Sequence, residues 1–536
     1  MKLNYEGLKD RAAWTAAGIR LPDFDLEEMC RATEAAPAWI HFGGGNIFRG
    51  FVARLQQELL NRGAAKTGIL AVSAHSRETI EKIYRPHDNM TLLVSLLPDG
   101  TMEKKVVASI AQGLCAGVPE DLESLRAAFR SPSLQMVSYT ITEKGYALTD
   151  LSGAYLPVVE ADFQNGPDRC THAMSLTAAL LLERFQAGGA PVALVSMDNC
   201  SHNGEKLRES VLTVVDQWLE RGFADRDFAA WVKNEDNVAF PWTMIDKITP
   251  RPAQAVAEAL AADGVEDMEP IVTGKSTYIA PFVNAEKPQY LVVEDHFPNG
   301  RPSLEQAGVY LTDRETVNKT EQMKVMTCLN PLHTALAVYG CLLGYTSIAA
   351  EMGDPELKAL VERIGYQEGM PVVVNPGIID PQAFIREVIE RRFPNPFVPD
   401  TPQRIATDTS QKIPVRFGET IRAYAQRADL DVKELTFIPL ALAGWLRYLL
   451  AVDDRGEAMP CSGDPMLEAL QAQLAGVTLG NPDSLSGRLT DILSNQAIFG
   501  SNLVELGLAE KIENMVRKML AGPGAVRETL RSYLYG

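Results

Sequence analysis

Three polar side chains interrupt an otherwise apolar stretch of the chain. In "KVMTCLNPLH" (324–333), Lys324, Asn330 and His333 precede the run "TALAVYGCLLGY". A lysine beside apolar surface loses stabilisation of its charge, so its pKa falls and it can act as a base near neutral pH. An asparagine amide donates to an oxygen that gains negative charge, and a neutral histidine does the same or relays a proton. Together they suit deprotonation of an alcohol while a cofactor takes hydride, without a metal.

The same residues also permit a structural interpretation. Asn is a favoured N-cap and Pro suits the first helical position, so Asn330 and Pro331 can simply begin a helix. Lys324 would then be the solvated end of the preceding segment. Taken alone, the stretch does not decide between a helix cap and a catalytic group.

A glycine-rich turn forms a second candidate site. In "FGGGNIFRG", Gly43 and Gly45 follow a predicted strand and open an amphipathic helix. Glycines there let backbone N–H groups approach a pyrophosphate at the positive helix end, although a plain tight turn is the alternative. The third glycine of G-x-G-x-x-G is replaced by Phe48. The acidic residue expected after the second strand (67–76) is absent, and Ser76 with Arg77 would tolerate a 2′-phosphate.

A polar cluster follows another predicted strand. "SMDNCSHNG" places Asp198, Asn199 and His202 directly after an apolar run, where ligands bind in a doubly wound sheet. Asn199 can donate a side-chain N–H to a substrate oxygen, while helix capping is the alternative. The alternating order Asp198–Cys200–His202 does not favour convergence on a metal. We therefore expect no metal site.

Length, composition and charge narrow the class of protein. At 536 residues the chain is too long for one ordinary domain. It is 46% hydrophobic and 22% charged, which is typical of a globular protein. The formal net charge of −18 argues against nucleic acid or an anionic membrane as partner. We expect no signal peptide, no membrane span, and reduced cysteines in a cytoplasmic protein.

The order of predicted elements indicates the fold. Strands and helices alternate through the first half, which predicts a mostly parallel, doubly wound sheet of the Rossmann type. The stretch 90–110 predicts a hairpin around Pro98-Asp99-Gly100. From about residue 320 the pattern is helical. We therefore predict an α/β fold with a dinucleotide-binding domain over 1–300 and a mainly helical substrate domain over 301–536.

Several blocks in a fixed order resemble one family. The blocks are "GGGNIFR", "TITEKGY" (140–146), "DNCSHNG" (198–204), "MIDKITP" (244–250), "VVEDHFPNGRP" (292–302) and "RFPNPFVPDTPQRIATDTSQK" (392–412). Together with the lysine stretch they resemble the polyol-specific long-chain dehydrogenases, or mannitol dehydrogenase family, over most of the chain. The resemblance implies hydride transfer between a nicotinamide and a sugar ketone, without zinc, with NAD expected and NADP not excluded.

The resemblance also implies roles for particular residues. Lys324 matches the catalytic lysine, Asn199 and Asn330 the oxyanion asparagines, and His333 the catalytic histidine. Glu321 matches an acidic residue that links the lysine to solvent. Substrate contacts are implied for Asp246, Arg404 and Lys412. The residues implied to bind the cofactor are Gly43, Gly45, Asn46, Phe48, Arg49, Ser76 and Thr140.

One departure from the family pattern makes a structural prediction. The family places four residues between the lysine and the asparagine, whereas five separate Lys324 from Asn330. On a straight helix at about 100° per residue, Lys324 and His333 would lie on opposite faces. They converge only if the helix is irregular, through Pro331 or a π-bulge. We predict such an irregularity between 324 and 331.

Within the family, the substrate is the finer question. The N-terminal stretch and "TCLNPLHTALAVYGCLLGY" resemble most the branch acting on D-fructuronate and D-mannonate, with mannitol or tagaturonate as rivals. A carboxylate substrate favours an extra cation, and the candidates are Arg404, Lys412, Lys144 and Arg301. Alternatives from other classes are an inactive sugar-acid binding protein and a metal-dependent lyase or isomerase.

Overall fold

The computed structural model describes residues 1–74, 77–150, 152–274 and 277–536. The chain divides into two compact units, Met1–Asn318 and Lys319–Gly536. The sequence placed the boundary at 300/301, and the units divide at 318/319. Strand β15 (Tyr310–Thr312) pairs in parallel with β14 (Tyr290–Glu294), and this pairing keeps the segment after 300 within the first unit.

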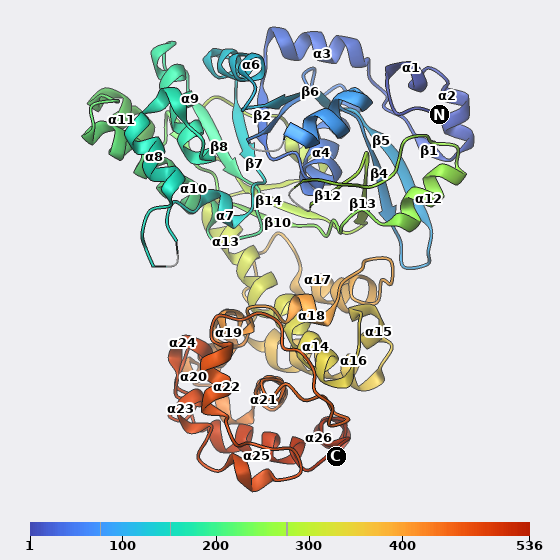
Figure 1. Cartoon of the computed structure of the whole chain (residues 1–536), viewed down its shortest axis with the longest axis vertical. Helices are drawn as coiled ribbons and strands as arrows, with labels where there is room; N and C mark the ends of the chain where they lie inside the picture. The colour runs from blue at the N-terminus through green and yellow to red at the C-terminus, as the bar shows by residue number, and fades with distance from the viewer. Residues whose placement is uncertain (75–76, 151, 275–276) are drawn as a thin grey trace. The chain divides into compact units, whose positions relative to one another are not determined.

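A six-stranded parallel sheet forms the centre of the first unit (Figure 1). Its strand order is β6-β3-β2-β7-β8-β9. The chain runs outward from β2 through β3 to β6, then returns to β7 and runs outward on the other side. The predicted doubly wound sheet is therefore confirmed, with its topological switch point between β2 and β7. The strands are β2 (Trp39–Phe42), β3 (Ile69–Ser73), β6 (Ile110–Cys115), β7 (Met136–Tyr139), β8 (Val192–Ser196) and β9 (Val238–Ala239).

Both faces of this sheet are covered, which explains why its strands read as continuous apolar runs. In β2, Ile40 and Phe42 pack into one core while Trp39 packs into the other. Helices on the first face include α6 (Pro119–Arg130), α9 (Ala173–Gln186) and α10 (Asn203–Glu220). Helix α4 (Ala53–Asn61) packs on the opposite face. Because helices cover both faces, a ligand can reach this sheet only at its edges, and in doubly wound sheets it binds beyond the carboxyl ends of the strands.

Three smaller sheets complete the described part of the first unit. One has the order β1-β5-β4-β13, another has the order β10-β14-β15, and the third pairs β11 (Ile271–Val272) with β12 (Tyr278–Ile279). The predicted hairpin is confirmed, because β4 and β5 pair antiparallel around Asp99 and Gly100. The strands not yet located are β1 (Ile19–Arg20), β4 (Thr91–Leu96), β5 (Met102–Val107), β10 (Thr243–Asp246) and β13 (Phe282–Glu286).

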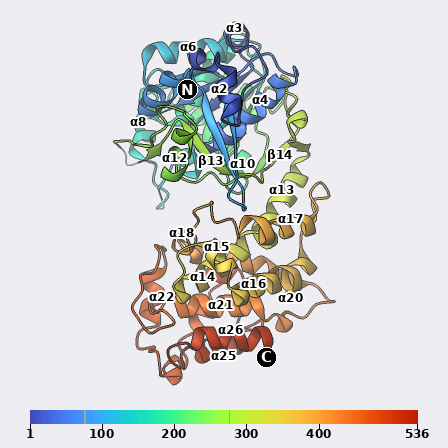
Figure 2. The ribbon, with the colours of Figure 1, turned by 90° about the vertical axis from the view of Figure 1, so that its right-hand side faces the viewer.

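The second unit is helical, as predicted. Helix α14 (Asn330–Leu343) packs on α21 (Phe437–Tyr448), which packs in turn on α25 (Ala509–Met519) (Figure 2). An 18-residue window of the helical stretch Arg314–Leu343 has a mean hydropathy of 1.3, so by length and composition the stretch could span a membrane. The expectation that the chain has no membrane span stays a prediction. Of that window, 72% is buried inside the protein, which is the environment of a core helix.

Candidate active site

The glycine loop lies at the carboxyl end of β2, beside the switch point. Gly43 has a φ of 112°, and a Cβ there would lie 2.1 Å from the carbonyl oxygen of Thr140. Only glycine fits so close an approach between this loop and the end of β7. At Gly45 a Cβ would meet no atom within 4 Å, so the loop is open on that side. This arrangement fits the phosphates of a dinucleotide.

Phe48 and Arg49 lie buried beneath the loop, at the start of the π-helix η1 (Phe48–Val52). The Phe48 ring stacks on His41, with ring centroids 4.0 Å apart. Arg49 donates from Nη1 to the Ala280 carbonyl at 2.7 Å and from Nη2 to Asn46 Oδ1 at 3.0 Å. These contacts fix Asn46 and the loop from within the protein. Direct contact of these side chains with a cofactor stays a prediction.

His41 was not singled out from the sequence, yet it holds Thr140 in place. Its ring nitrogens lie 2.6 Å from Ser138 Oγ and 2.9 Å from Thr140 Oγ1. Burial lowers the pKa of His41 well below its usual value, so the ring is neutral near pH 7. A neutral ring donates from one nitrogen and accepts at the other, and both neighbours are hydroxyls that suit either role. Thr140 is thereby oriented at the switch point.

The end of the second strand is described only in part. Ser76, predicted to contact the cofactor, lies outside the described residues. Arg77 is described, and its Nε donates to Glu81 at 2.6 Å. The contact is an exposed ion pair within one helical turn, so Arg77 is already paired.

Asp198 joins the loops that follow β7 and β8. Its carboxylate accepts from the backbone N–H groups of Ile141 and Thr142, at 2.8 and 3.0 Å. It also accepts from the Tyr146 hydroxyl at 2.6 Å. Burial raises the pKa of Asp198, although these three donors act against the shift. Asn199, the next residue, lies exposed at the carboxyl end of β8, where the sequence predicted it.

A second tether connects β8 to β10. The side chain of Asn203 donates to the carbonyls of Asp198 and Thr243, each at 3.0 Å. The Thr243 N–H donates back to Asn203 Oδ1 at 3.1 Å. Asp246 ends β10 and is 6% exposed. Asp198 therefore joins the loop after β7 to the loop after β8, and Asn203 joins the loop after β8 to β10. Asn199 lies in the loop after β8, and Asp246 lies at the end of β10.

The predicted irregularity near Lys324 is confirmed. Helix α13 (Arg314–Gln322) passes into the π-helix η6 (Met323–Cys328), where the Leu329 N–H donates to the Lys324 carbonyl at 3.1 Å. Leu329 is not helical, with φ −132° and ψ −60°, and α14 begins at Asn330 with Pro331 in its first turn. Glu321 lies in the last turn of α13. The extra residue is therefore absorbed by a wider turn.

The π turn changes which face Lys324 occupies. Nine residues at about 100° each would set Lys324 and His333 about 180° apart, but absorbing one residue reduces the separation to about 80°. Lys324 is 2% exposed. Asn330 is half-buried at the start of α14. The second unit therefore places Lys324, Asn330 and His333 on one continuous segment and on neighbouring faces.

Asp400 is a second residue that the sequence did not single out. Its Oδ2 lies 3.0 Å from His333 Nε2, within ion-pair distance but without hydrogen-bond geometry. Arg404 donates to the other oxygen of Asp400, from Nε at 3.0 Å. Burial lowers the pKa of His333, and Asp400 only partly opposes the shift, so the imidazole is neutral near pH 7. Asp400 thus connects two predicted site residues.

Lys412 and Arg416 follow on α19 (Thr409–Ile413) and the π-helix η10 (Pro414–Gly418). Lys412 donates to the carbonyls of Ile405 and Thr407. Burial lowers its pKa to about 8, and the charge of Arg416 contributes. Arg416 was not predicted. Its guanidinium donates to Thr334 Oγ1 at 2.7 Å, one residue beyond His333.

Metal-ligating groups do not gather in the described part of the chain. Among the described residues, no three His, Cys, Asp or Glu side chains are placed to hold a metal ion. His202, which the sequence raised as a possible ligand, lies 3.4 Å from Glu205 instead.

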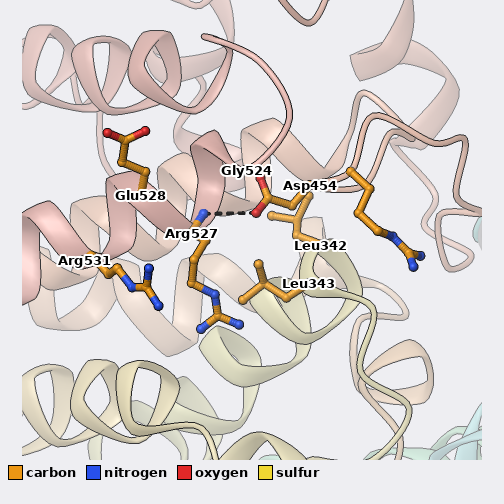
Figure 3. A pocket seen from close by; sticks show the side chains of 8 residues that line it. Leu342, Leu343, Asp454, Gly524, Arg527, Glu528 and Arg531 are labelled. Atoms are coloured by element: carbon orange, nitrogen blue, oxygen red, sulfur yellow. Dashed lines mark hydrogen bonds between the residues drawn. The ribbon is translucent and has the colours of Figure 1, made fainter.

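A pocket of about 630 Å³ lies elsewhere in the second unit. Figure 3 shows its lining, which includes Leu342, Leu343, Asp454 and Arg527. No predicted site residue lines it. The Arg527 guanidinium is paired with Asp354, and Asp454 accepts from the Arg527 backbone N–H. Because none of the predicted site residues lines it, this pocket is not assigned to the reaction.

Two family models together match most of the chain. The model described as "Mannitol dehydrogenase Rossmann domain" matches residues 37–306. The model described as "Mannitol dehydrogenase C-terminal domain" matches residues 316–520. The chain belongs to the mannitol dehydrogenase family. This confirms the resemblance drawn from the ordered blocks, and it makes the protein an oxidoreductase that acts on a CH–OH group.

Individual relatives extend over nearly the full length. The D-mannonate oxidoreductase of Thermotoga maritima is 54% identical, covering 99% of this chain and 98% of that protein. The D-mannonate oxidoreductase of Escherichia coli is 30% identical, covering 87% and 93%. Among solved structures, the ternary complex of Pseudomonas fluorescens mannitol 2-dehydrogenase with NAD and D-mannitol has a TM-score of 0.72 at 26% identity, covering 100% and 99%.

Proposed function

We propose that this family member is an NAD-dependent D-mannonate oxidoreductase, also called fructuronate reductase, which interconverts D-fructuronate and D-mannonate. The observation that carries the assignment is the likeness to the Thermotoga maritima D-mannonate oxidoreductase over nearly the whole of both chains. The solved mannitol 2-dehydrogenase shares the fold at a much lower identity, which favours a sugar acid over a hexitol. Its complex with NAD supports NAD as the cofactor of this chain.

The mechanism that we propose divides the work among four side chains. In reduction, protonated Lys324 gives its proton to the ketone oxygen, while Asn199 and Asn330 donate to that oxygen as its negative charge grows. In oxidation, neutral Lys324 takes the hydroxyl proton. Neutral His333 keeps its one N–H on Nε2, beside Asp400, so that Nδ1 accepts a hydrogen bond from a substrate hydroxyl. Bound NADH supplies the hydride, and NAD accepts it in reverse.

Further residues bind or exchange protons in this proposal. Glu321, one turn before Lys324, passes protons between the lysine and solvent. Asp246, Arg404 and Lys412 bind the substrate. The loop of Gly43 and Gly45 would hold the cofactor phosphates. We also propose a cytoplasmic location, because all seven cysteines are free thiols, as a reducing compartment keeps them.

The test is consumption of NADH at 340 nm with D-fructuronate, D-tagaturonate and D-fructose in parallel, repeated with NADPH and with EDTA. We expect turnover on D-fructuronate well above the other two, with a preference for NADH and no loss in EDTA. Turnover on D-fructose alone would replace the proposal with a mannitol 2-dehydrogenase. No turnover on any of the three would favour a binding protein without catalysis, and loss in EDTA would favour a metal-dependent enzyme.

A further inference from the structure

Arg416 lies among the predicted catalytic groups of the second unit. Its π-helix η10 packs against η6, which carries Lys324, and against α14, which carries Asn330 and His333. The charge of Arg416 acts on both neighbouring titratable groups, since it lowers the pKa of His333 and that of Lys412. Its position is therefore set by the same helices that hold the reacting groups.

Arg416 is half-buried, and no acidic side chain among the described residues compensates its charge. Within the described residues, the hydroxyl of Thr334 is its one hydrogen-bond partner, and no carboxylate lies within 4.0 Å. Burial lowers its pKa to about 10, and no acidic neighbour opposes that shift. A buried cation without a counter-charge is costly, so such groups are normally paired.

Arg447 is a buried arginine of the same unit that has a structural role, and it can be compared with Arg416. Arg447 is fully buried, and it donates to the carbonyls of Met519, Val452 and Asp453. The neighbouring carboxylates of Asp453 and Asp454 raise its pKa against the effect of burial. Arg416 has neither the ring of carbonyls nor the acids. Two of its nitrogens, Nε and Nη2, have no protein partner in the described part of the chain.

Three of the other cations considered for a substrate carboxylate are already engaged. Arg301 forms ion pairs with Asp295 and Glu305 at 2.7 and 2.8 Å. The side chain of Arg404 is 65% exposed and pairs with Asp400. Lys412 donates to two backbone carbonyls. Arg416 therefore lies near His333 with two nitrogens that have no protein partner among the described residues. A planar guanidinium fork matches a carboxylate in two parallel hydrogen bonds.

We propose that Arg416 binds the carboxylate of the sugar-acid substrate and so determines the preference for a uronate over a neutral ketose. The inference rests on the proposed function, because it assigns a residue to the substrate's anionic end. The carboxylate accepts from Nε and Nη2, while Nη1 stays on Thr334 and keeps the fork oriented. Thr334 donates onward to the Asn330 carbonyl at 3.0 Å, which couples the fork to the oxyanion residue.

The test compares KM and kcat for D-fructuronate and D-fructose in the wild type and in Arg416→Gln. Loss of charge-assisted hydrogen bonds is expected to raise KM for D-fructuronate about 10- to 100-fold, with kcat within a few-fold of the wild type. Turnover of D-fructose should hardly change, so the ratio of kcat/KM between the two substrates falls by the same factor. Added guanidinium chloride should restore part of the loss in Arg416→Ala.

Two controls separate recognition from support of the fold. Thr334→Val removes the protein partner of Arg416 but keeps the guanidinium, so the preference for the uronate should survive. Arg422→Gln removes an arginine on the next helix, α20 (Glu419–Gln426), that is paired with Glu419. It should leave both substrates unaffected. If Thr334→Val and Arg416→Gln have equal effects on both substrates, Arg416 only anchors α14 and the inference is overturned.

The anion bound by Arg416 could also belong to the cofactor. Titration of Arg416→Gln with NADH by fluorescence distinguishes the two sources, since binding of a substrate carboxylate leaves the NADH Kd unchanged. A large rise in that Kd would overturn the inference. A wild type that turns over D-fructuronate, with a substrate ratio unchanged in Arg416→Gln, refutes the inference alone. A wild type inactive on every uronate refutes the proposed function, and the inference with it.

Discussion

The two units hold their predicted site residues in different ways. In the first unit, Phe48 and Arg49 are buried and contact His41, Ala280 and Asn46, although Arg49 Nε has no hydrogen-bond partner among the described residues. In the second unit, Lys324 lies on a π turn, and the half-buried Arg416 forms no ion pair in the described part of the chain. In our proposal, side chains of the first unit shape the backbone that binds the cofactor, and those of the second unit take part in the reaction.

The largest expected effect is that of Lys324→Met. Loss of the acid and base is expected to lower kcat by about 10²- to 10⁴-fold. Binding of NADH, which we propose for the other unit, should change less than two-fold. The measurement is NADH oxidation with D-fructuronate beside a fluorescence titration of NADH. Lys358→Met, an exposed lysine on α16 (Pro355–Glu362), is the matched control and should behave as the wild type. If Lys324→Met weakened NADH binding as much as it lowered kcat, the two units would not have the separate roles that we propose.

Asn330→Ala is expected to follow in size. Removing one oxyanion donor typically costs about 10²- to 10³-fold in kcat. Because Asn330 begins α14 without a side-chain capping bond in the structure, unfolding temperature should change little. Steady-state rates and thermal unfolding of the purified variant measure both. Near-normal turnover, or a loss explained by unfolding, would remove Asn330 from the reaction and return it to the role of a helix cap.

Glu351 of the second unit makes a prediction about how the free energy of unfolding depends on pH. This carboxyl is fully buried beside Gly340 of α14, and neither oxygen has a hydrogen-bond partner among the described residues. Burial raises its pKa to about 9. The folded state therefore keeps a proton that the unfolded state loses above about pH 4.5, so stability falls as pH rises from about 4.5 to 9.

Glu351→Gln removes that dependence, since an amide does not titrate. From pH 5 to pH 8 its free energy of unfolding relative to the wild type should rise by about 4 kcal/mol. Urea unfolding at the two pH values measures the difference. A constant offset between the two proteins would mean that Glu351 is not held neutral.

The smallest effect concerns Lys412. Its pKa of about 8 means that the ammonium loses its charge as pH rises through 8, so an anionic substrate binds better below this pH. We expect KM for D-fructuronate to rise several-fold between pH 7 and pH 9, and Lys412→Met to abolish that rise. A pH profile of KM at saturating NADH tests this. The same rise in Lys412→Met would assign it to another group.

Much of this architecture could be predicted from the sequence, because local pattern determined it. Apolar runs that end in glycine or polar clusters indicated a parallel sheet and its loops. A single extra residue before Asn330, followed by Pro331, predicted a break in the helix, and η6 is that break. Helix geometry is periodic, so a change of one residue in spacing has a calculable consequence.

What sequence reasoning missed depends on tertiary packing. Asp400 meets His333 across 67 positions, and Arg416 meets Thr334 across 82. No local periodicity predicts such pairs. A signal was present for Asp400, which precedes Arg404 by four residues. Arg416 lies four residues beyond the last recognised block, and its two nitrogens without a protein partner among the described residues are visible only in the structure.

One measurement tests hydride transfer to a uronate most directly. The protein is incubated with NADH carrying deuterium at the transferred position and with D-fructuronate, and the product is identified by mass spectrometry and NMR. The proposed function predicts D-mannonate with one deuterium on the carbon that was the ketone. An epimeric product, or D-mannonate without deuterium, would contradict it.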